Sequence, residues 1–198
     1  MIAKRIFDLF FALIGIIVLL PLFGAIAAWI ELDSPGPVFF RQTRIGQFGR
    51  EFTLYKFRTM VANAEVLGKQ ITATDDPRIT RSGNFLRKYK LDELPQLFNV
   101  VKGEMSLVGP RPEVPNYVAL YTTEQRRVLE VPPGMTDLAS IEFRNESNLL
   151  AGISHPEDLY IQEIMPKKLA LNLDYISQTS LTFDLLIIFK TLWLVLVD

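Results

Sequence analysis

Two adjacent carboxylates, Asp92 and Glu93, are the residues of this chain best suited by type and position to do chemistry. Three cations come directly before them, at Arg87, Lys88 and Lys90. A rigid Gly-Pro-Arg-Pro segment follows at 109–112. Carboxylates beside cations stay ionised at neutral pH, and an ionised aspartate can attack a phosphoryl group covalently. A magnesium ion held partly by carboxylate and partly by substrate phosphates would offset the charge, so the pattern indicates phosphoryl transfer.

A structural interpretation of the same pair stays open on local sequence alone. A helix is predicted to begin here, and helix N-termini favour anions through free N–H groups and the helix dipole. Aspartate is also a common N-cap residue, so Asp92 could be a cap and Glu93 an exposed neighbour. No other nucleophile stands out, however, in a chain with no Cys and one His.

The composition excludes several classes of site. Without Cys there is no disulfide framework, thiolate zinc site, iron–sulfur cluster or Cys nucleophile, and His155 alone cannot form a two-His metal site. The net charge of −1 hides a basic segment at 31–111, with 13 Lys and Arg against 9 Asp and Glu, whereas 112–198 has 6 against 12. A basic middle segment suits phosphate, nucleotide or lipid headgroups. It is too weakly basic to predict a nucleic-acid partner.

The elements that position these groups begin with an apolar run. Residues 9–30 contain no charge, and about 20 apolar residues suffice to span the ~30 Å hydrocarbon layer as a helix. Pro21 lies mid-run and should kink the helix, because proline removes a backbone donor and clashes with the preceding turn. Three interpretations stay open: a cleaved signal peptide, a transmembrane anchor, or a kinked helix that returns to the face it entered. Basic residues on both flanks fit the last slightly better.

Shorter patterns predict the remaining elements. Apolar spacing of about 3.6 residues indicates helices, and β-rich runs indicate strands. Ser82 is a candidate N-cap for the helix that follows it, and the apolar tail at 181–197 should pack on a bilayer face or in the core. The expected strands are 38–40 and 51–57, and the expected helices are 61–68, 84–89, 92–101, 115–130 and 166–177.

Six stretches carry longer motifs, at 4–8, 34–42, 55–60, 76–80, 91–100 and 102–112. They read Lys-Arg-Ile-Phe-Asp, Ser-Pro-Gly-Pro-Val-Phe-Phe-Arg-Gln, Tyr-Lys-Phe-Arg-Thr-Met, Asp-Pro-Arg-Ile-Thr, Leu-Asp-Glu-Leu-Pro-Gln-Leu-Phe-Asn-Val and Lys-Gly-Glu-Met-Ser-Leu-Val-Gly-Pro-Arg-Pro. With these motifs in this order, the chain resembles the small monotopic phosphoglycosyl transferases, bacterial sugar transferases that start glycan assembly on polyprenyl phosphate.

The resemblance implies a reaction. In such enzymes a nucleoside diphosphate sugar, usually UDP-linked, gives its sugar-1-phosphate to membrane polyprenyl (undecaprenyl) phosphate; UMP leaves and a polyprenyl diphosphosugar remains. The Asp of the Asp-Glu pair is the nucleophile that attacks the β-phosphate, which falls on Asp92 here. Glu93 matches the partner carboxylate, which assists magnesium binding or acceptor deprotonation. Mg²⁺ is the expected cofactor, with Asp92 and Glu93 as its ligands.

Cations are also expected in the site, because phosphoryl transfer depends mainly on positioning and electrostatics. Each candidate could instead form a structural salt bridge. The chain departs from many members at 137–143, so its donor sugar can differ from theirs. An Asp that members often carry near the end falls on Asn172, which makes Asp174 nearby a third, weaker metal-ligand candidate. The candidate phosphate-binding residues are Lys56, Arg58, Arg87, Arg111 and Arg144.

The expected fold class is α+β: a mostly helical monotopic membrane protein with a Pro-broken re-entrant helix, a small β element and interfacial helices. Residues 1–33 form the membrane helix–break–helix around Pro21. Residues 34–198 form a catalytic domain on the cytoplasmic face of the bacterial inner membrane, ending in the interfacial helix 181–197. The expected partners are a UDP-sugar, polyprenyl phosphate and the bilayer. The sugar, the glycan pathway and a homo-oligomer are left open.

Two other functions remain as alternatives. A membrane scaffold that has lost turnover is motivated by the divergent segment 137–143, although the intact Asp92-Glu93 pair argues against it. A membrane phosphatase with an Asp nucleophile would need an Asp-x-Asp-x-Thr signature, which the sequence lacks.

Overall fold

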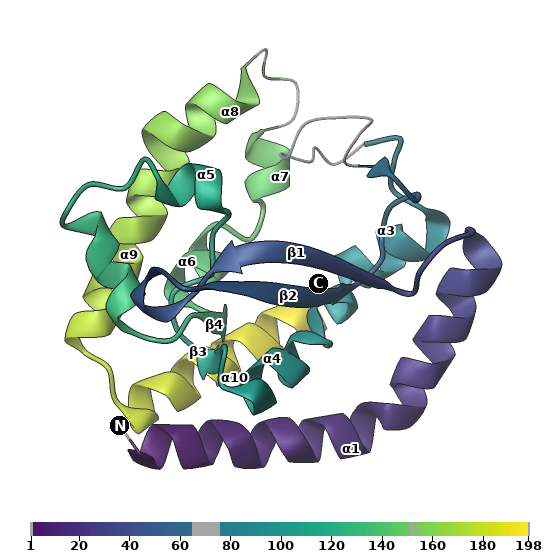
Figure 1. The fold of residues 1–198 in the computed structure, drawn as a ribbon, viewed down its shortest axis with the longest axis horizontal. Coiled ribbons are helices and arrows are strands. Elements are labelled where there is room, and N and C mark those ends of the chain that lie inside the picture. The colour runs from purple at the N-terminus through teal and green to yellow at the C-terminus, as the bar shows by residue number, and fades with distance from the viewer. Residues whose placement is uncertain (1, 65–75, 151–152, 154, 198) are drawn as a thin grey trace.

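The computed structural model describes residues 2–64, 76–150, 153 and 155–197. Most of the described chain is helical, with two small sheets. Figure 1 shows the long helix α1 (Ile2–Asp33) along the base of the molecule, with the strands and most other helices above it. The predicted mostly helical α+β class is confirmed at this level.

The predicted break at Pro21 is a bend inside one helix, α1. In Figure 1 this helix runs along the base and then turns upward toward the sheet. Proline removes one backbone hydrogen bond and kinks the helix, but the flanking turns keep their own bonds, so the element bends without ending. Return of the chain to the membrane face it entered stays a prediction.

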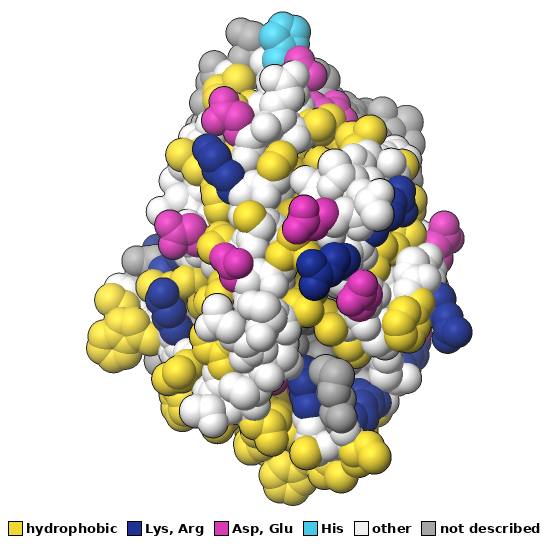
Figure 2. Space-filling view, turned by 90° about the vertical axis from the view of Figure 1, so that its left-hand side faces the viewer, with side chains coloured by type: hydrophobic (Ala, Val, Ile, Leu, Met, Phe, Trp, Pro, Cys, Tyr) yellow, Lys and Arg dark blue, Asp and Glu magenta, His cyan; other side chains and the backbone are white. Residues whose placement is uncertain are grey.

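Only one side of α1 is buried, although the helix is apolar on most sides. It is long and apolar enough to cross a membrane, yet just 17% of its most apolar stretch is buried in the protein. The buried side includes Phe23, Ile26 and Ile30 and packs against α4 (Gln96–Lys102). Figure 2 shows hydrophobic side chains gathered along the lower edge, where α1 lies. An exposed apolar surface of this size marks a membrane or protein contact.

Two cations near the start of α1 hold it to the rest of the chain. The Lys4 ammonium donates to Val108 O at 3.0 Å and forms an ion pair with the buried Asp184. The Arg5 guanidinium donates to Val100 O at 2.6 Å, in the last turn of α4. Carbonyls in a last turn lack intrahelical partners, so Arg5 caps α4 and fixes α1 against it.

An antiparallel sheet of β1 (Phe39–Ile45) and β2 (Glu51–Phe57) crosses the middle of the molecule, joined by the turn η1 (Gln47–Gly49). β2 has its predicted bounds. β1 starts one residue later than the predicted 38–40 and is longer, because its exposed and half-buried residues alternate and pair along all of β2. The sheet carries the motif that contains Lys56 across the pocket.

A second, parallel pair, β3 (Ser106–Val108) and β4 (Gly134–Thr136), lies outside the predicted strands. Each strand has three residues, too few to show a periodic pattern. Just beyond β3, two glycines approach so closely that a Cβ on Gly134 would lie 2.1 Å from Gly109 N. This contact requires glycine at both positions, and it places the Gly-Pro-Arg-Pro segment beside β4.

Helix boundaries differ from prediction around the dyad. α3 (Arg81–Lys88) begins before the predicted residue 84, and its cap is Thr80 rather than Ser82, since the Thr80 hydroxyl accepts from Gly83 N at 3.0 Å. The helix predicted for 92–101 begins only after Pro95, because proline suits the start of a helix and not its interior. Before it lies a short 3₁₀ turn, η2 (Leu91–Glu93).

The helix predicted for 115–130 is two elements, α5 (Pro115–Val118) and η3 (Gln125–Glu130). Thr122 N donates to Gln125 Oε1 at 2.9 Å, and Gln125 N donates to Thr122 Oγ1 at 3.3 Å. This reciprocal pair is a capping box, which starts a new helical segment. The prediction of one continuous helix is therefore wrong.

The C-terminal part of the chain is helical. The predicted helices 166–177 and 181–197 are confirmed as α9 (Met165–Ser177) and α10 (Leu181–Val197). α10 packs on α6 and the parallel pair and exposes apolar side chains on its other side; its contact with a bilayer stays a prediction. Half of the helix predicted for 61–68, the residues 65–68, lies outside the described residues. The remaining elements are α6 (Leu138–Glu142), α7 (Glu146–Leu149), α8 (Pro156–Leu159) and the π-helical turn η4 (Tyr160–Ile164).

Candidate active site

The two carboxylates lie in the turn η2 between α3 and α4. Lys90 before them has a φ of 54°, in the left-handed region that side chains other than glycine rarely adopt. This sharp turn carries Asp92 and Glu93 into the wall of a pocket. The interpretation of Asp92 as the cap of α4 is wrong, because Pro95 occupies that position and no side chain caps it.

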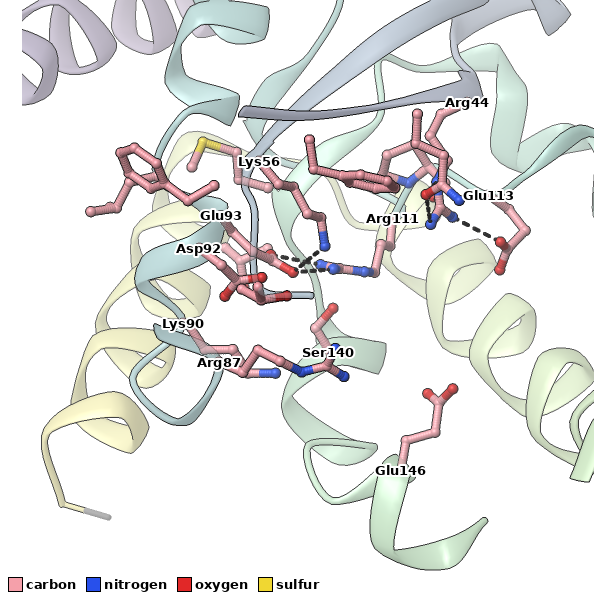
Figure 3. A pocket seen from close by; sticks show the side chains of 18 of the residues that line it. Arg44, Lys56, Arg87, Lys90, Asp92, Glu93, Arg111, Glu113, Ser140 and Glu146 are labelled. Atoms are coloured by element: carbon pink, nitrogen blue, oxygen red, sulfur yellow. Dashed lines mark hydrogen bonds and ion pairs between the residues drawn. The ribbon is translucent and has the colours of Figure 1, made fainter. Parts of the chain in front are cut away.

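Glu93 is saturated by cations that come from two distant segments. Lys56 Nζ, on β2, donates to Glu93 Oε1 at 2.9 Å, and Arg111 donates to Oε2 at 3.1 Å. A second Arg111 nitrogen pairs with Oε1, which makes the guanidinium contact bidentate (Figure 3). Burial alone would raise the pKa of Glu93, but Arg111 and Lys56 outweigh it and hold that pKa well below its usual range. Glu93 is therefore an ionised anchor for two cations.

Asp92 lies beside this clamp and takes no part in it. The residue is 8% exposed, and no hydrogen bond or ion pair joins its carboxylate to any residue that the structure describes. Burial raises the pKa of Asp92, the charge of Glu93 adds to that rise, and Lys56 opposes it. A buried carboxylate with unengaged oxygens in a pocket is a candidate nucleophile or metal ligand.

Arg111 is positioned through its backbone by the parallel pair and by Asp137. Gly134 N donates to Pro110 O at 2.9 Å. The fully buried Asp137 accepts from Arg111 N at 3.2 Å and from Ser140 N at 2.6 Å. One carboxylate thus caps α6 and holds the loop that aims Arg111 at Glu93. Sequence reasoning missed this residue, although Asp is a common N-cap residue directly before a helix.

The other predicted phosphate-binding residues divide into two groups. Arg87, in the last turn of α3, and Arg144 line the pocket, and the charge of Arg87 acts on Asp92. Arg58 also lines it but is 5% exposed, and its terminal nitrogens donate to Pro35 O at 2.6 Å and Ser34 O at 2.7 Å. Arg58 therefore holds the segment directly after α1 through these two hydrogen bonds.

The pocket is a large hollow of about 1960 Å³. Figure 3 shows Lys56, Arg111 and both carboxylates of the dyad together, with Arg87 below them; this part of the pocket is called the dyad end. On α9, Asn172 lines the pocket, whereas Asp174 is exposed and lies outside its lining. The structure thus brings the dyad and three predicted cations together and leaves Asp174 apart.

The carboxylates of the dyad meet part of what a magnesium ion requires of its ligands. Among the described residues, no group of three or more acidic or imidazole side chains could hold a metal. Mg²⁺, however, is usually bound by one or two carboxylates together with waters and substrate phosphates. Asp92, whose oxygens are free, fits such a site, and Glu93 could contribute only while sharing its oxygens with Lys56 and Arg111.

Comparison with known proteins gives consistent matches. A family described as bacterial sugar transferase matches residues 1–198. A UDP-N-acetylgalactosamine-undecaprenyl-phosphate N-acetylgalactosaminephosphotransferase of Aeromonas hydrophila is 40% identical over 194 residues. A UDP-glucose:undecaprenyl-phosphate glucose-1-phosphate transferase of Xanthomonas campestris pv. campestris is 41% identical over 195 residues. An uncharacterised sugar transferase of Bacillus subtilis, EpsL, is 40% identical over 198 residues.

These three matches cover 96%, 96% and 100% of this chain. They cover 42%, 38% and 89% of the relatives, so the chain spans less than half the length of the first two. The family is the one predicted from the six motifs, and the expectation of a transferase enzyme is confirmed with it. The chain belongs to the bacterial sugar transferase family.

Proposed function

We propose that the protein transfers sugar-1-phosphate from a UDP-sugar to undecaprenyl phosphate through an aspartyl intermediate, and so initiates assembly of a bacterial surface glycan. One observation carries the proposal: Glu93 is saturated by Lys56 and Arg111, while Asp92 beside it has no partner among the described side chains. The names of the two longer relatives, which give undecaprenyl phosphate as the substrate of those proteins, support the same acceptor here.

In the first step, a carboxylate oxygen of Asp92 attacks the β-phosphorus of the donor. The bond from this phosphorus to the bridging oxygen breaks, UMP leaves with the electron pair, and the phosphosugar stays on Asp92. The Asp92 oxygens accept no hydrogen bond from the residues that the structure describes, so the attack breaks none of the described bonds. Arg111 and Lys56 lie where charge develops on the phosphoryl oxygens, and such preorganised cations are the main source of catalysis in phosphoryl transfer.

In the second step, a phosphate oxygen of undecaprenyl phosphate attacks the same phosphorus and displaces the Asp92 carboxylate. The product is undecaprenyl diphosphosugar, and the free carboxylate is regenerated. UMP leaves before the lipid attacks, so one phosphate-binding region serves both substrates in turn. This order is a ping-pong mechanism.

Glu93 acts in this scheme by positioning rather than by accepting a proton. A general base works best when its pKa lies near the working pH, and the pKa of Glu93 is held well below its usual range despite burial. Of the two roles expected for Glu93, magnesium binding and deprotonation of the acceptor, the second is therefore disfavoured. The ionised carboxylate instead orients Arg111 and Lys56.

Magnesium is part of the proposal, because the carboxylates of the dyad could serve as its ligands. Asp92 would be its main protein ligand, with Glu93 as a second and the donor phosphates completing the shell. When bound, it would neutralise charge on those phosphates. Removal of divalent cations with EDTA is expected to abolish transfer, and added Mg²⁺ to restore it.

We also propose that the protein resides in the bacterial inner membrane, and that α1 enters the membrane from the cytoplasmic face and returns to that face. The exposed apolar surface of α1 and the bend in a helix that contains Pro21 support this placement. Reporter tags at the two ends of the chain test it. Both tags should report the cytoplasm, and a periplasmic N-terminus would contradict re-entry.

The reaction is tested with UDP-sugars that carry radioactive β-phosphate. Label should appear on the protein when no acceptor is present and should move to lipid when undecaprenyl phosphate is added. Free phosphosugar released without acceptor would instead support the phosphatase alternative. Absence of both labelled protein and UMP release with every common UDP-sugar would support the scaffold alternative.

A further inference from the structure

The pocket wall built by α6 and α9 carries uncharged polar groups that have no hydrogen-bond partner among the described residues. Asn172 on α9 is 4% exposed, and its Oδ1 is enclosed without a hydrogen bond within the described part of the chain. The Ser140 hydroxyl oxygen on α6 is enclosed and unpartnered in the same way. Both residues line the pocket, and α6 packs against α9.

Asn172 belongs to the face of α9 that looks into the pocket. Met165, Lys168, Leu169 and Asn172 all line it, at the i, i+3, i+4 and i+7 spacing that places residues on one side of a helix. Asp174, two positions further on, is exposed. The amide of Asn172 is therefore directed toward the pocket by the phase of its helix.

Ser140 is tied to the reacting end of the pocket through Asp137. The two oxygens of this carboxylate accept from Ser140 N at 2.6 Å and from Arg111 N at 3.2 Å. Figure 3 shows the Ser140 hydroxyl pointing toward the pair of Arg111 and Glu93. A group bound to Ser140 would thus lie next to a phosphate bound by Arg111.

The two ends of the pocket differ in charge. The dyad end holds Lys56, Arg87 and Arg111. On the α9 wall, Lys168 is paired with Glu146 at 2.7 Å, and the unpartnered atoms belong to an amide and a hydroxyl. Nearly all buried polar groups in proteins have a partner, so a ligand that fills the pocket is the natural partner for these two. An amide and a hydroxyl match hydroxyl or acylamino groups without charge.

We propose that Asn172 and Ser140 form the subsite for the donor's sugar, and that they bind neutral hydroxyl or acylamino groups. This inference rests on the proposed function and names its substrate class. The sugar is assigned rather than the nucleoside, because the sugar is bonded directly to the phosphate that reacts at the dyad, and Ser140 points toward Arg111 of that clamp. The nucleoside lies one phosphate further away.

The test compares Asn172→Ala and Ser140→Ala with a matched control, Asn84→Ala, at an exposed position of α3 outside the pocket. For each full-length protein in detergent, Tm is measured alone, with UDP and with a neutral UDP-hexose, and kcat/KM is measured for the hexose donor. Asn172→Ala should keep or raise the ligand-free Tm, because it removes an unpartnered buried amide. Its kcat/KM should fall about 10- to 100-fold, while the Tm shift caused by UDP is unchanged.

Four outcomes would overturn the inference. A lower ligand-free Tm with equal loss of both ligand shifts would make Asn172 structural. Equal weakening of UDP and UDP-hexose with an unchanged ligand-free Tm would assign it to the nucleoside. Kinetics and ligand shifts that match Asn84→Ala would remove Asn172 from the site. Preference of the unmodified protein for a UDP-hexuronic acid over a UDP-hexose would refute the neutral class. Absence of transfer with an intact hexose-dependent Tm shift would sink the proposed function and leave the subsite standing.

Discussion

Two buried clusters of acidic and basic side chains hold this protein together, and only one of them is complete. In the cluster where α1 meets α10, Asp184 Oδ1 accepts from Tyr175 OH at 2.6 Å and its Oδ2 pairs with Lys4. Asp8 in the same cluster accepts from Ser106 Oγ at 2.8 Å and from Leu107 N at 3.1 Å. Each carboxylate oxygen there has a donor.

The dyad cluster has the same ingredients but leaves one acid over. Glu93 is paired on both oxygens, whereas Asp92 has neither a hydrogen bond nor an ion pair to the described residues. A buried charge without a partner costs stability, and a chain keeps such a group where it serves a function. Burial of acids beside cations therefore does not distinguish a structural cluster from a reactive one. The two clusters differ instead in how many carboxylate oxygens lack a hydrogen-bond donor.

Asp92→Asn gives the sharpest contrast between the clusters. Loss of a covalent nucleophile should lower transfer by at least about 10⁴-fold, and no labelled protein should form. The ligand-free protein should keep or gain stability, because a buried unpaired charge is removed. Transfer assays and thermal unfolding measure the two effects, and retained labelling would move the nucleophile to another residue.

Lys4→Met should do the reverse in the complete cluster. It leaves Asp184 buried without its cation, and breaking a buried pair in this way costs about 3–5 kcal/mol. Chemical unfolding of the protein in detergent measures the loss. The double variant Lys4→Met/Asp184→Asn should recover part of it, since no charge is then left unpaired. If the single variant is as stable as the unmodified protein, the cluster does not hold α1 in place.

Arg111→Lys keeps the charge of the clamp and removes its bidentate geometry. A lysine is not equivalent to arginine at such a site, and loss of one preorganised donor typically lowers kcat by about 10²–10³-fold. Arg127→Lys, at an exposed position of η3, is the matched control and should leave kcat unchanged. Equal kcat values for the two variants would show that charge alone suffices at position 111.

The smallest effect is the pH dependence of stability that Glu93 confers. Burial would raise the pKa of this carboxyl, but Arg111 and Lys56 lower it well below its usual value of 4.5. In this range the unfolded chain binds more protons than the folded one, so stability rises with pH. The contribution is complete above 4.5 and is lost as pH falls through the folded pKa. The free energy of unfolding of Glu93→Gln, measured from pH 3 to 7, should lack this rise of stability with pH. If the rise is unchanged in the variant, it comes from another acid.

Local sequence predicted those parts of the site that lie in continuous motifs. The dyad, Lys56 and Arg111 each stand in a short motif, and the structure brings them together. The strand β2 was predicted from a β-rich run and the helix α10 from a long apolar run, and α9 lies within one residue of its predicted bounds. The phase of α9 also separates Asn172 from Asp174, so the burial of the first was readable from helical spacing.

The rest depends on pairings between distant segments. Asp137 supports Arg111 only because two strands of three residues each lie in parallel register, and strands so short leave no pattern. Arg58 was predicted to bind phosphate, but the carbonyls that it contacts lie 23 and 24 residues earlier in the chain. Pro95 displaces the start of α4 past the dyad, which removes the interpretation of Asp92 as a cap and leaves that of a candidate nucleophile.

The hydrogen bond from Lys4 to Val108 O links the position of α1 to the position of the active site. It joins the first turns of α1 to the strand that ends three residues before Arg111. In the proposed membrane placement, the depth of α1 in the bilayer would therefore set the height of the reacting groups above it. Lipid phosphates lie in one plane, so an enzyme anchored in the proposed way would meet a lipid acceptor by lateral diffusion at a fixed height. Folding would fix the height of the reacting groups once, and each later encounter with a lipid acceptor would then require a search only in the plane of the membrane.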